Sequence, residues 1–142
     1  EPSVVVEEIF RVLKKNGLVY AETPFMQQVH EGAYDFSRFT VLGHRYLFKR
    51  FNLIDMGGIG GTDVVLAWAV RYLVWSLTRS QYLSKFIGVT IGIILRTLRI
   101  FISKKSYHDA SSGVFFLGKK PKHKYHLSHK DLVSLYKGQF KA

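Results

Sequence analysis

The sequence predicts an α/β fold, in which helices pack on the faces of a small sheet. Three observations lead to this prediction. An amphipathic stretch over residues 4–15 ends at a glycine turn, a short β-favouring run follows it directly, and two further runs of that kind come later. A helix, a tight turn and a buried strand make half of a β-α-β repeat. The length of 142 residues suits one domain.

The first predicted element is a helix over residues 4–15, where apolar side chains recur at helical spacing. Ser3 is placed to cap its start, and Asn16-Gly17 supplies the left-handed conformation that commonly ends a helix. Residues 18–23 favour a strand. Because they alternate too little for a half-exposed strand, we expect a buried parallel strand there.

Residues 24–40 mix polar and aromatic side chains without periodicity, which predicts a long loop. Thr40 is placed to cap a helix over about 41–50, with His44 and Arg45 on its more exposed face. A second strand is predicted over 51–56. The glycine cluster that follows it lacks the third glycine and the later acidic residue of a dinucleotide-binding fingerprint, so it predicts a flexible turn.

Two strongly apolar helices are predicted next, over about 64–78 with Asp63 as its cap, and over 82–102. The uncharged run of the second helix has ten residues, about half of what crossing a bilayer requires. Two arrangements stay open: a hairpin whose large apolar side chains pack against each other, or a hairpin lying in a membrane interface. The first arrangement would join Trp68, Trp75, Phe86, Ile91 and Ile94.

A third strand is predicted over 113–118, followed by a basic tail over 121–142 with a short helix that Ser128 opens. The tail holds three histidines at a spacing of three residues. The surrounding lysines argue against a cation site, so we expect no metal. These histidines are His123, His126 and His129.

The charges are unevenly distributed. Residues 1–63 hold seven Lys and Arg against eight Asp and Glu, whereas residues 64–142 hold fourteen against two. This asymmetry predicts an anionic partner for the second half, either a membrane surface or, as the weaker alternative, nucleic acid. The first residues show no signal-peptide pattern, which favours a cytoplasmic location, peripheral at the membrane, and the start without Met indicates a fragment.

The loop after the first strand holds the densest set of candidate functional side chains. It follows the carboxyl end of that strand, where open α/β sheets bind ligands. His30 is a candidate general base, because histidine titrates near neutral pH. Tyr34, Asp35 and Arg38 are candidates for binding a substrate. Asp35 and Arg38 could instead form an ion pair that only holds the loop, and Tyr34 could serve in packing.

Three motifs carry a resemblance to a known family: Arg-Val-Leu-Lys-x-x-Gly over residues 11–17, Thr-Pro-Phe over 23–25, and Tyr-Asp-Phe-Ser-Arg-Phe-Thr over 34–40. With them, residues 1 to about 58 resemble the C-terminal half of class I S-adenosylmethionine-dependent methyltransferases of the type 11 kind. Asn16 stands where that family often has glycine.

The resemblance implies a partial Rossmann-like methyltransferase sheet, made of C-terminal strands and helices over residues 1–58 and 113–120. Residues 59–112 then form a helical-hairpin insertion, and strand 51–56 pairs antiparallel with strand 113–118. In such enzymes the glycine-rich cofactor loop lies in the first half of the domain. The residues that bind S-adenosylmethionine are therefore expected upstream of Glu1.

The function implied by the resemblance is the substrate-side half of a methyltransferase, inactive as this fragment alone. His30 would act as the base, and Tyr34, Asp35 and Arg38 would line the acceptor pocket. The acceptor would be a small molecule or a glycan or lipid-linked precursor. The alternative is a non-enzymatic basic module that binds a membrane surface or nucleic acid through residues 64–142.

Overall fold

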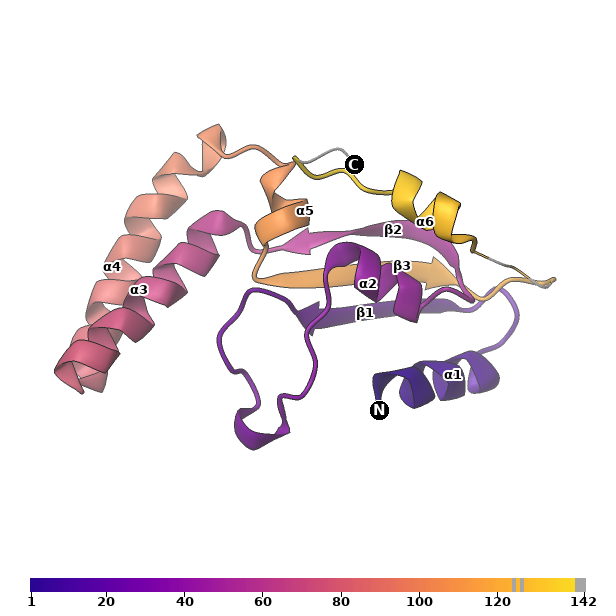
Figure 1. Cartoon of the computed structure of the whole chain (residues 1–142), viewed down its shortest axis with the longest axis horizontal. Helices are drawn as coiled ribbons and strands as arrows, with labels where there is room; N and C mark the ends of the chain where they lie inside the picture. Colours follow the sequence, from indigo (N-terminus) through magenta and orange to yellow (C-terminus); the bar gives the residue numbers. More distant parts are fainter. Residues whose placement is uncertain (124, 126, 140–142) are drawn as a thin grey trace.

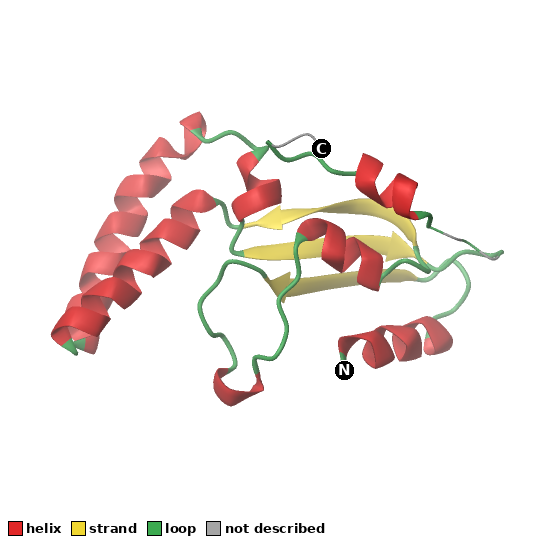
Figure 2. Cartoon of the chain, in the orientation of Figure 1, coloured by secondary structure: helices red, strands yellow, loops and turns green. Residues whose placement is uncertain are grey.

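The computed structural model describes residues 1–123, 125 and 127–139 (Figure 1). Within these residues the fold is α/β, with six α-helices around one three-stranded antiparallel sheet (Figure 2). The strands are β1 (Leu18–Pro24), β2 (Asn52–Ile59) and β3 (Gly113–Lys119).

β3 lies in the middle of the sheet and pairs antiparallel with both β1 and β2. Val19 of β1 and Leu53 of β2 both face Gly118 of β3 across the sheet. The predicted antiparallel pairing of the second and third strands is confirmed. Because both partners run against β3, β1 and β2 point in the same direction, and their carboxyl ends lie at the same edge of the sheet.

The prediction of a buried parallel strand at residues 18–23 was wrong. β1 is an edge strand, and its exposure alternates: Leu18 is 60% and Tyr20 58% exposed, whereas Val19 is buried. Helices cover the face to which Val19 belongs, and the opposite face of β1 is open. The residues of β1 are thus apolar enough for burial on both faces of the strand, but the described residues cover only one face.

Helices α1 (Pro2–Val12) and α2 (Val41–Leu47) pack on the covered face of the sheet. The core below them is built from aromatic rings. The Phe48 and Phe116 rings stack with their centroids 4.8 Å apart, and Phe51 packs edge-on against Phe116. Burial of these large apolar surfaces supplies most of the driving force for folding this part of the chain.

α1 begins and ends earlier than predicted. Its N-cap is Glu1, and Ser3 does not cap it because Ser3 already lies in the first helical turn. Asn16 adopts the left-handed conformation predicted for the turn, with φ 66°. The Lys120 ammonium then donates a hydrogen bond of 2.7 Å to the carbonyl oxygen of Leu13, which ties the end of α1 to the end of β3.

α2 begins as predicted, since the Thr40 hydroxyl accepts a hydrogen bond from a backbone N–H of the first turn. The predicted exposure of His44 and Arg45 was wrong, because both are buried. The chain reverses directly after α2, and the Arg45 guanidinium donates to the carbonyl oxygens of Phe48 at 2.8 Å and Phe51 at 3.1 Å. These contacts, with a third hydrogen bond of 3.1 Å to the Tyr125 hydroxyl, partner the two terminal nitrogens of the guanidinium and the carbonyls of the turn.

The glycine cluster is not a flexible turn. β2 continues through Gly57 and Gly58 to Ile59, and helix α5 (Ser106–Ala110) packs on it. A Cβ at Gly58 would lie 2.0 Å from the Tyr107 carbonyl oxygen, so the close approach of α5 requires glycine there. Gly60 follows with φ 61°, in the left-handed region.

Helices α3 (Thr62–Thr78) and α4 (Gln81–Thr97) form an antiparallel hairpin that projects from one end of the sheet (Figure 1). A 3₁₀-helix over Leu98–Phe101 extends α4. The N-cap of α3 is Gly61, and Asp63, predicted as the cap, is buried in the first turn instead. Near the C-terminus, the predicted short helix is present as α6 (His129–Ser134) with Ser128 as its cap.

Candidate functional site

The loop over residues 25–40 leaves the carboxyl end of β1 and is anchored to the segment before β3. The backbone N–H of Phe25 donates to the Ser112 carbonyl at 2.8 Å, and that of Met26 donates to the Ser111 carbonyl at 3.2 Å. One 3₁₀ turn, Gly32–Tyr34, lies inside it. The loop is therefore held at the sheet edge that ligands of open α/β sheets commonly occupy.

Asp35 organises the loop from within. Its carboxylate accepts a 2.7 Å hydrogen bond from the backbone N–H of His30 and one of 2.5 Å from the Arg38 guanidinium, which also donates to the Gln28 carbonyl. The His30 backbone hydrogen bond, and after it the Arg38 guanidinium, hold the pKa of Asp35 below its ordinary value. Because the Asp35 side chain is only 7% exposed, its charge is used mainly to hold the loop.

A pocket of about 360 Å³ lies between this loop and the ends of the strands. His30, Glu31, Gln27, Glu22 and Ser112 supply polar side chains to its lining. The Nδ1 atom of His30 lies 3.0 Å from a carboxylate oxygen of Glu31, which orients the imidazole. A histidine that lines a pocket and has one ring nitrogen engaged by a carboxylate is suited to accept a proton from a bound hydroxyl or amine.

The structure divides the four predicted site residues into three groups. His30 lines the pocket, whereas Asp35 and Arg38 form the ion pair that holds the loop. Tyr34 lies on the outer side of the loop with 81% of its surface exposed. Asp35 and Arg38 form the ion pair that the sequence offered as one of two interpretations. A role of any of the four residues in binding a substrate stays a prediction.

Sequence analysis missed Glu22, Glu31 and Ser112 as pocket residues. Glu22 and Ser112 are far apart in the chain and meet because Pro24 pairs with Gly113 across the sheet. For Glu31 the sequence did offer a signal, because this acidic residue directly follows His30. A carboxylate next to a candidate base in the same loop can orient that base.

A second candidate region is the α3–α4 hairpin, whose helices meet through small side chains. Ala67, Ser84 and Gly88 are buried at the contact, and a Cβ at Gly88 would lie 2.8 Å from the Cβ of Arg71. Of the five large side chains that the packed arrangement would join, Phe86, Ile94 and Trp75 are exposed, to 70%, 56% and 39%. Small residues let the two backbones approach closely, and the bulky side chains point outward.

A basic groove of about 470 Å³ runs along this hairpin. Four of its side chains are cationic: Arg71, Lys85, Arg96 and Arg99. The one acidic residue in the lining is Asp63, with a carboxylate oxygen 3.8 Å from Nε of Arg99. Trp68 lies beside them, with the Arg71 guanidinium 5.4 Å from its ring centroid. The groove can therefore attract an anionic group while offering it an aromatic wall.

The Ser112 hydroxyl and the Tyr107 ring lie close to Gly60 and Gly61, at the positions that added Cβ atoms would occupy. Within residues 1–123, 125 and 127–139, no group of three or more His, Asp and Glu side chains is arranged to hold a metal ion. His126 of the histidine series lies outside the described residues. No described helix combines the length and apolar character needed to cross a membrane.

Comparison of the chain with protein-family models, with curated proteins and with solved structures gives no match. The site geometry and the sequence motifs are therefore the basis for any functional assignment.

Proposed function

We propose that this chain is the acceptor-side part of an S-adenosylmethionine-dependent methyltransferase acting on a small molecule or on a glycan or lipid-linked precursor. The observation that carries the proposal is the pocket containing His30 at the carboxyl end of β1. The family motifs over residues 11–17 and 34–40 support it, and so does the antiparallel pairing of β2 with β3, which the resemblance implies.

The strand directions also support an acceptor site at this position. β1 and β2 end at the same edge, and α2 connects them along the chain, as in a β-α-β crossover. The pocket lies at that edge between the 25–40 loop, Ile59 and Gly113. Ligands of open α/β sheets bind at the carboxyl ends of strands, where loops converge.

The resemblance places the glycine-rich cofactor loop in the first half of such a domain, so we expect no complete cofactor site within residues 1–142. The cofactor would supply the methyl group. The residues described here would act on the acceptor alone. They would orient it and remove its proton.

In this proposal His30 accepts the proton of an acceptor hydroxyl or amine, and the Glu31 carboxylate, 3.0 Å from Nδ1, stabilises the imidazolium that forms. Asp35 is a positioning residue. It holds the His30 backbone N–H at 2.7 Å and is itself held by Arg38. Moving the imidazole by even about 1 Å is expected to slow the reaction strongly, because proton transfer requires hydrogen-bond distance.

The test is His30→Ala in the intact protein, with turnover and binding of the methyl donor measured separately. We expect turnover to fall about 100-fold or more with donor affinity nearly unchanged, because a general base contributes about 10²–10⁴-fold. His123→Ala, which truncates an exposed histidine of the tail, is the matched control. Unchanged turnover in His30→Ala would make His30 a structural loop residue and would remove the proposed base.

The alternative function, a non-enzymatic basic module, is favoured by a different observation, the basic groove of the hairpin. Binding of an anionic partner at the groove would not by itself exclude methyl transfer, because the His30 pocket and the groove are built from separate elements.

A further inference from the structure

We propose that the α3–α4 hairpin docks on the surface of an anionic lipid bilayer. Its basic groove would face the lipid phosphates, and its exposed apolar side chains would enter the interfacial layer. Three features of the hairpin carry this inference: a cationic groove, a set of exposed bulky apolar residues on both helices, and aromatic side chains beside the cationic ones.

The charge of the hairpin is complementary to an anionic surface. The sequence contains no Asp or Glu between Asp63 and Asp109, and Asp63 already faces Arg99. Further cations lie at the tip of the hairpin and after its base, beyond the four that line the groove. These are Arg79, Lys104 and Lys105, all exposed. Polybasic segments of this kind bind anionic leaflets, and each added charge strengthens the attraction.

The apolar surface of the hairpin is larger than its own packing requires. Because small residues fill the contact between the helices, the bulky ones remain outside. On α4, Phe86 is 70% and Ile93 63% exposed, and on α3 Leu77 is 76% exposed. Scattered single apolar residues are ordinary on a protein surface, but a series along both helices indicates a surface that becomes covered.

Aromatic residues lie beside the cationic side chains of the hairpin. Trp68 lines the groove beside Arg71, and Tyr72 packs edge-on against Trp75 with ring centroids 6.2 Å apart. Trp and Tyr side chains prefer the headgroup region of a bilayer, where one end of the ring is apolar and the other is hydrated.

A bilayer fits these features better than nucleic acid or a second copy of the chain. A phosphate backbone would satisfy the groove but would leave Leu77, Phe86 and Ile93 exposed to water. A second copy would cover apolar surface but would bring two basic grooves together. Since Lys85 and Arg96 lie within α4, the helix is expected to lie in the plane of the interface.

The binding test uses intrinsic fluorescence. The chain has two tryptophans, Trp68 and Trp75, and both lie on α3, so emission reports on the hairpin alone. Vesicles of phosphatidylcholine with about 30 mol% phosphatidylglycerol are compared with vesicles of phosphatidylcholine only. We expect a blue shift, and quenching by brominated acyl chains, with the anionic vesicles. Raising NaCl from about 0.05 M to about 0.5 M should reverse the binding, because salt screens the charges.

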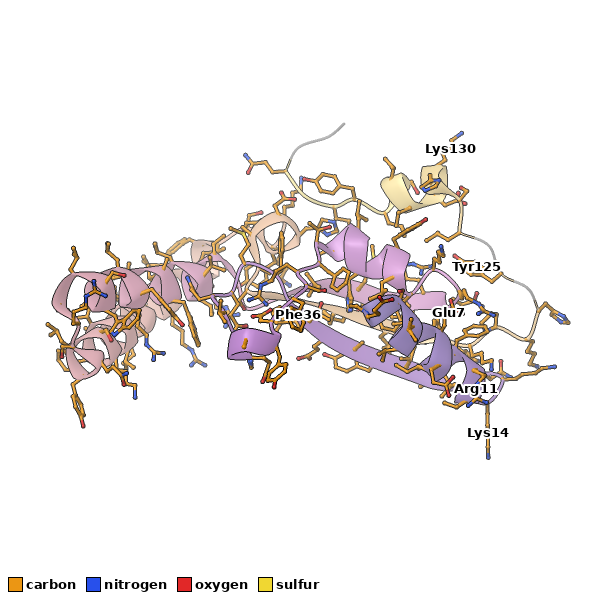
Figure 3. The ribbon with its side chains drawn as sticks, turned by 60° about the horizontal axis from the view of Figure 1, so that its bottom comes forward. Glu7, Arg11, Lys14, Phe36, Tyr125 and Lys130 are labelled. Carbon is orange, nitrogen blue, oxygen red and sulfur yellow. The ribbon has the colours of Figure 1, made fainter. Side chains whose placement is uncertain are left out.

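Matched variants distinguish the effect of charge on the hairpin from the effect of the total charge of the chain. Lys85→Glu/Arg96→Glu and Lys14→Glu/Lys15→Glu change the net charge equally, and all four side chains are exposed. Lys14 lies at the end of the molecule opposite the hairpin (Figure 3). We expect vesicle affinity to fall at least about tenfold for the first pair and less than about threefold for the second.

A second pair of variants tests the apolar contribution. Phe86→Ser removes an exposed ring from α4, and Phe36→Ser removes a ring that is 84% exposed in the 25–40 loop. Only Phe86→Ser should weaken vesicle binding and reduce quenching by brominated lipid, by about threefold or more.

Several outcomes would overturn the inference. They are equal binding to neutral and anionic vesicles, binding to neither, equal losses in the two lysine-containing pairs, or an emission shift caused by short DNA or by raising the protein concentration without vesicles. The assay contains no methyl donor and no acceptor, so its result is independent of the proposed function.

Discussion

The sheet body, made of α1, α2 and the three strands, buries large side chains, whereas the α3–α4 hairpin buries small ones. In the sheet body, Phe51 and Phe116 are fully buried under the helices. In the hairpin, Gly88 and Ser84 occupy the contact between the helices, and Phe86 lies outside. Both regions are rich in apolar residues, so composition alone does not distinguish them.

The difference separates two uses of apolar surface. Burying an aromatic ring in the sheet body lowers the free energy of the folded state directly. An exposed ring on the hairpin adds almost nothing to folding and remains available for a partner. Substitutions of the same residue type in the two regions should therefore have very different effects on stability, and they provide the most direct test of the comparison.

Phe116→Ala should have the largest effect on stability. The ring is 0% exposed and stacks on Phe48, so its removal leaves a cavity and should lower the free energy of unfolding by about 3–5 kcal/mol. Phe86→Ala, the matched change in the hairpin, should alter it by less than about 0.5 kcal/mol. Urea unfolding followed by circular dichroism measures both.

If Phe116→Ala is too unstable to purify, Phe116→Leu is the substitute, with an expected loss of about 1–2 kcal/mol. Equal losses for the Phe116 and Phe86 variants would show that the hairpin side chains are buried in solution, and the distinction between the two regions would fail.

Periodicity and turn residues predicted most of the sheet body. These patterns predicted the helix before Asn16 and the three strands, and the family resemblance implied the antiparallel pairing of β2 with β3. The burial of His44 and Arg45 was not, because residue type argues for exposure and the carbonyls that Arg45 satisfies come from a chain reversal. Such a compensation depends on three-dimensional contacts that spacing along the chain does not show.

His44 should make the stability of the sheet body depend on pH. Burial lowers its pKa from 6.5 to about 4, and its two ring nitrogens have no hydrogen-bond partner among the described residues. Between pH 6.5 and about 4 the unfolded chain therefore binds a proton at this site that the folded chain does not. Stability is constant above this window and falls as pH decreases through it, by up to about 3 kcal/mol.

His44→Leu replaces the titratable imidazole by an apolar side chain of similar size, and it should remove this part of the pH dependence. The measurement is the free energy of unfolding at about pH 7 and about pH 4.5 for both proteins. Burial also lowers the pKa of His108, which adds a smaller loss of the same sign to both. The same loss of stability on acidification in wild type and His44→Leu would contradict the prediction.

The sequence predicted where the candidate site lies better than it predicted which residues line it. Placing a functional loop after the first strand needed only the strand and the absence of periodicity that follows it. Dividing its residues between pocket and scaffold needed the contacts themselves, because His30 and Asp35 share a hydrogen bond but only His30 lines the pocket. The hairpin was ambiguous for a related reason: helical spacing shows which residues share a face, and not which face is covered.

Two glycines of α4 provide the finest test of packing in the hairpin. A Cβ at Gly88 would lie 2.8 Å from the Cβ of Arg71, so Gly88→Ala should push the helices apart and cost about 1–2 kcal/mol. At Gly92 the added Cβ would lie 3.7 Å from that of Ala67, an ordinary contact. Gly92→Ala should therefore stabilise the hairpin by up to about 1 kcal/mol, because alanine favours helix.

The two substitutions lie four residues apart on the same helix, so the two variants have the same composition, charge and helix propensity. Thermal unfolding followed by tryptophan emission reports on the hairpin, since Trp68 and Trp75 both lie on α3. We expect the midpoint to fall for Gly88→Ala and to rise for Gly92→Ala. If both rise, helix propensity alone decides the result, and the helices do not approach as closely as their small residues allow.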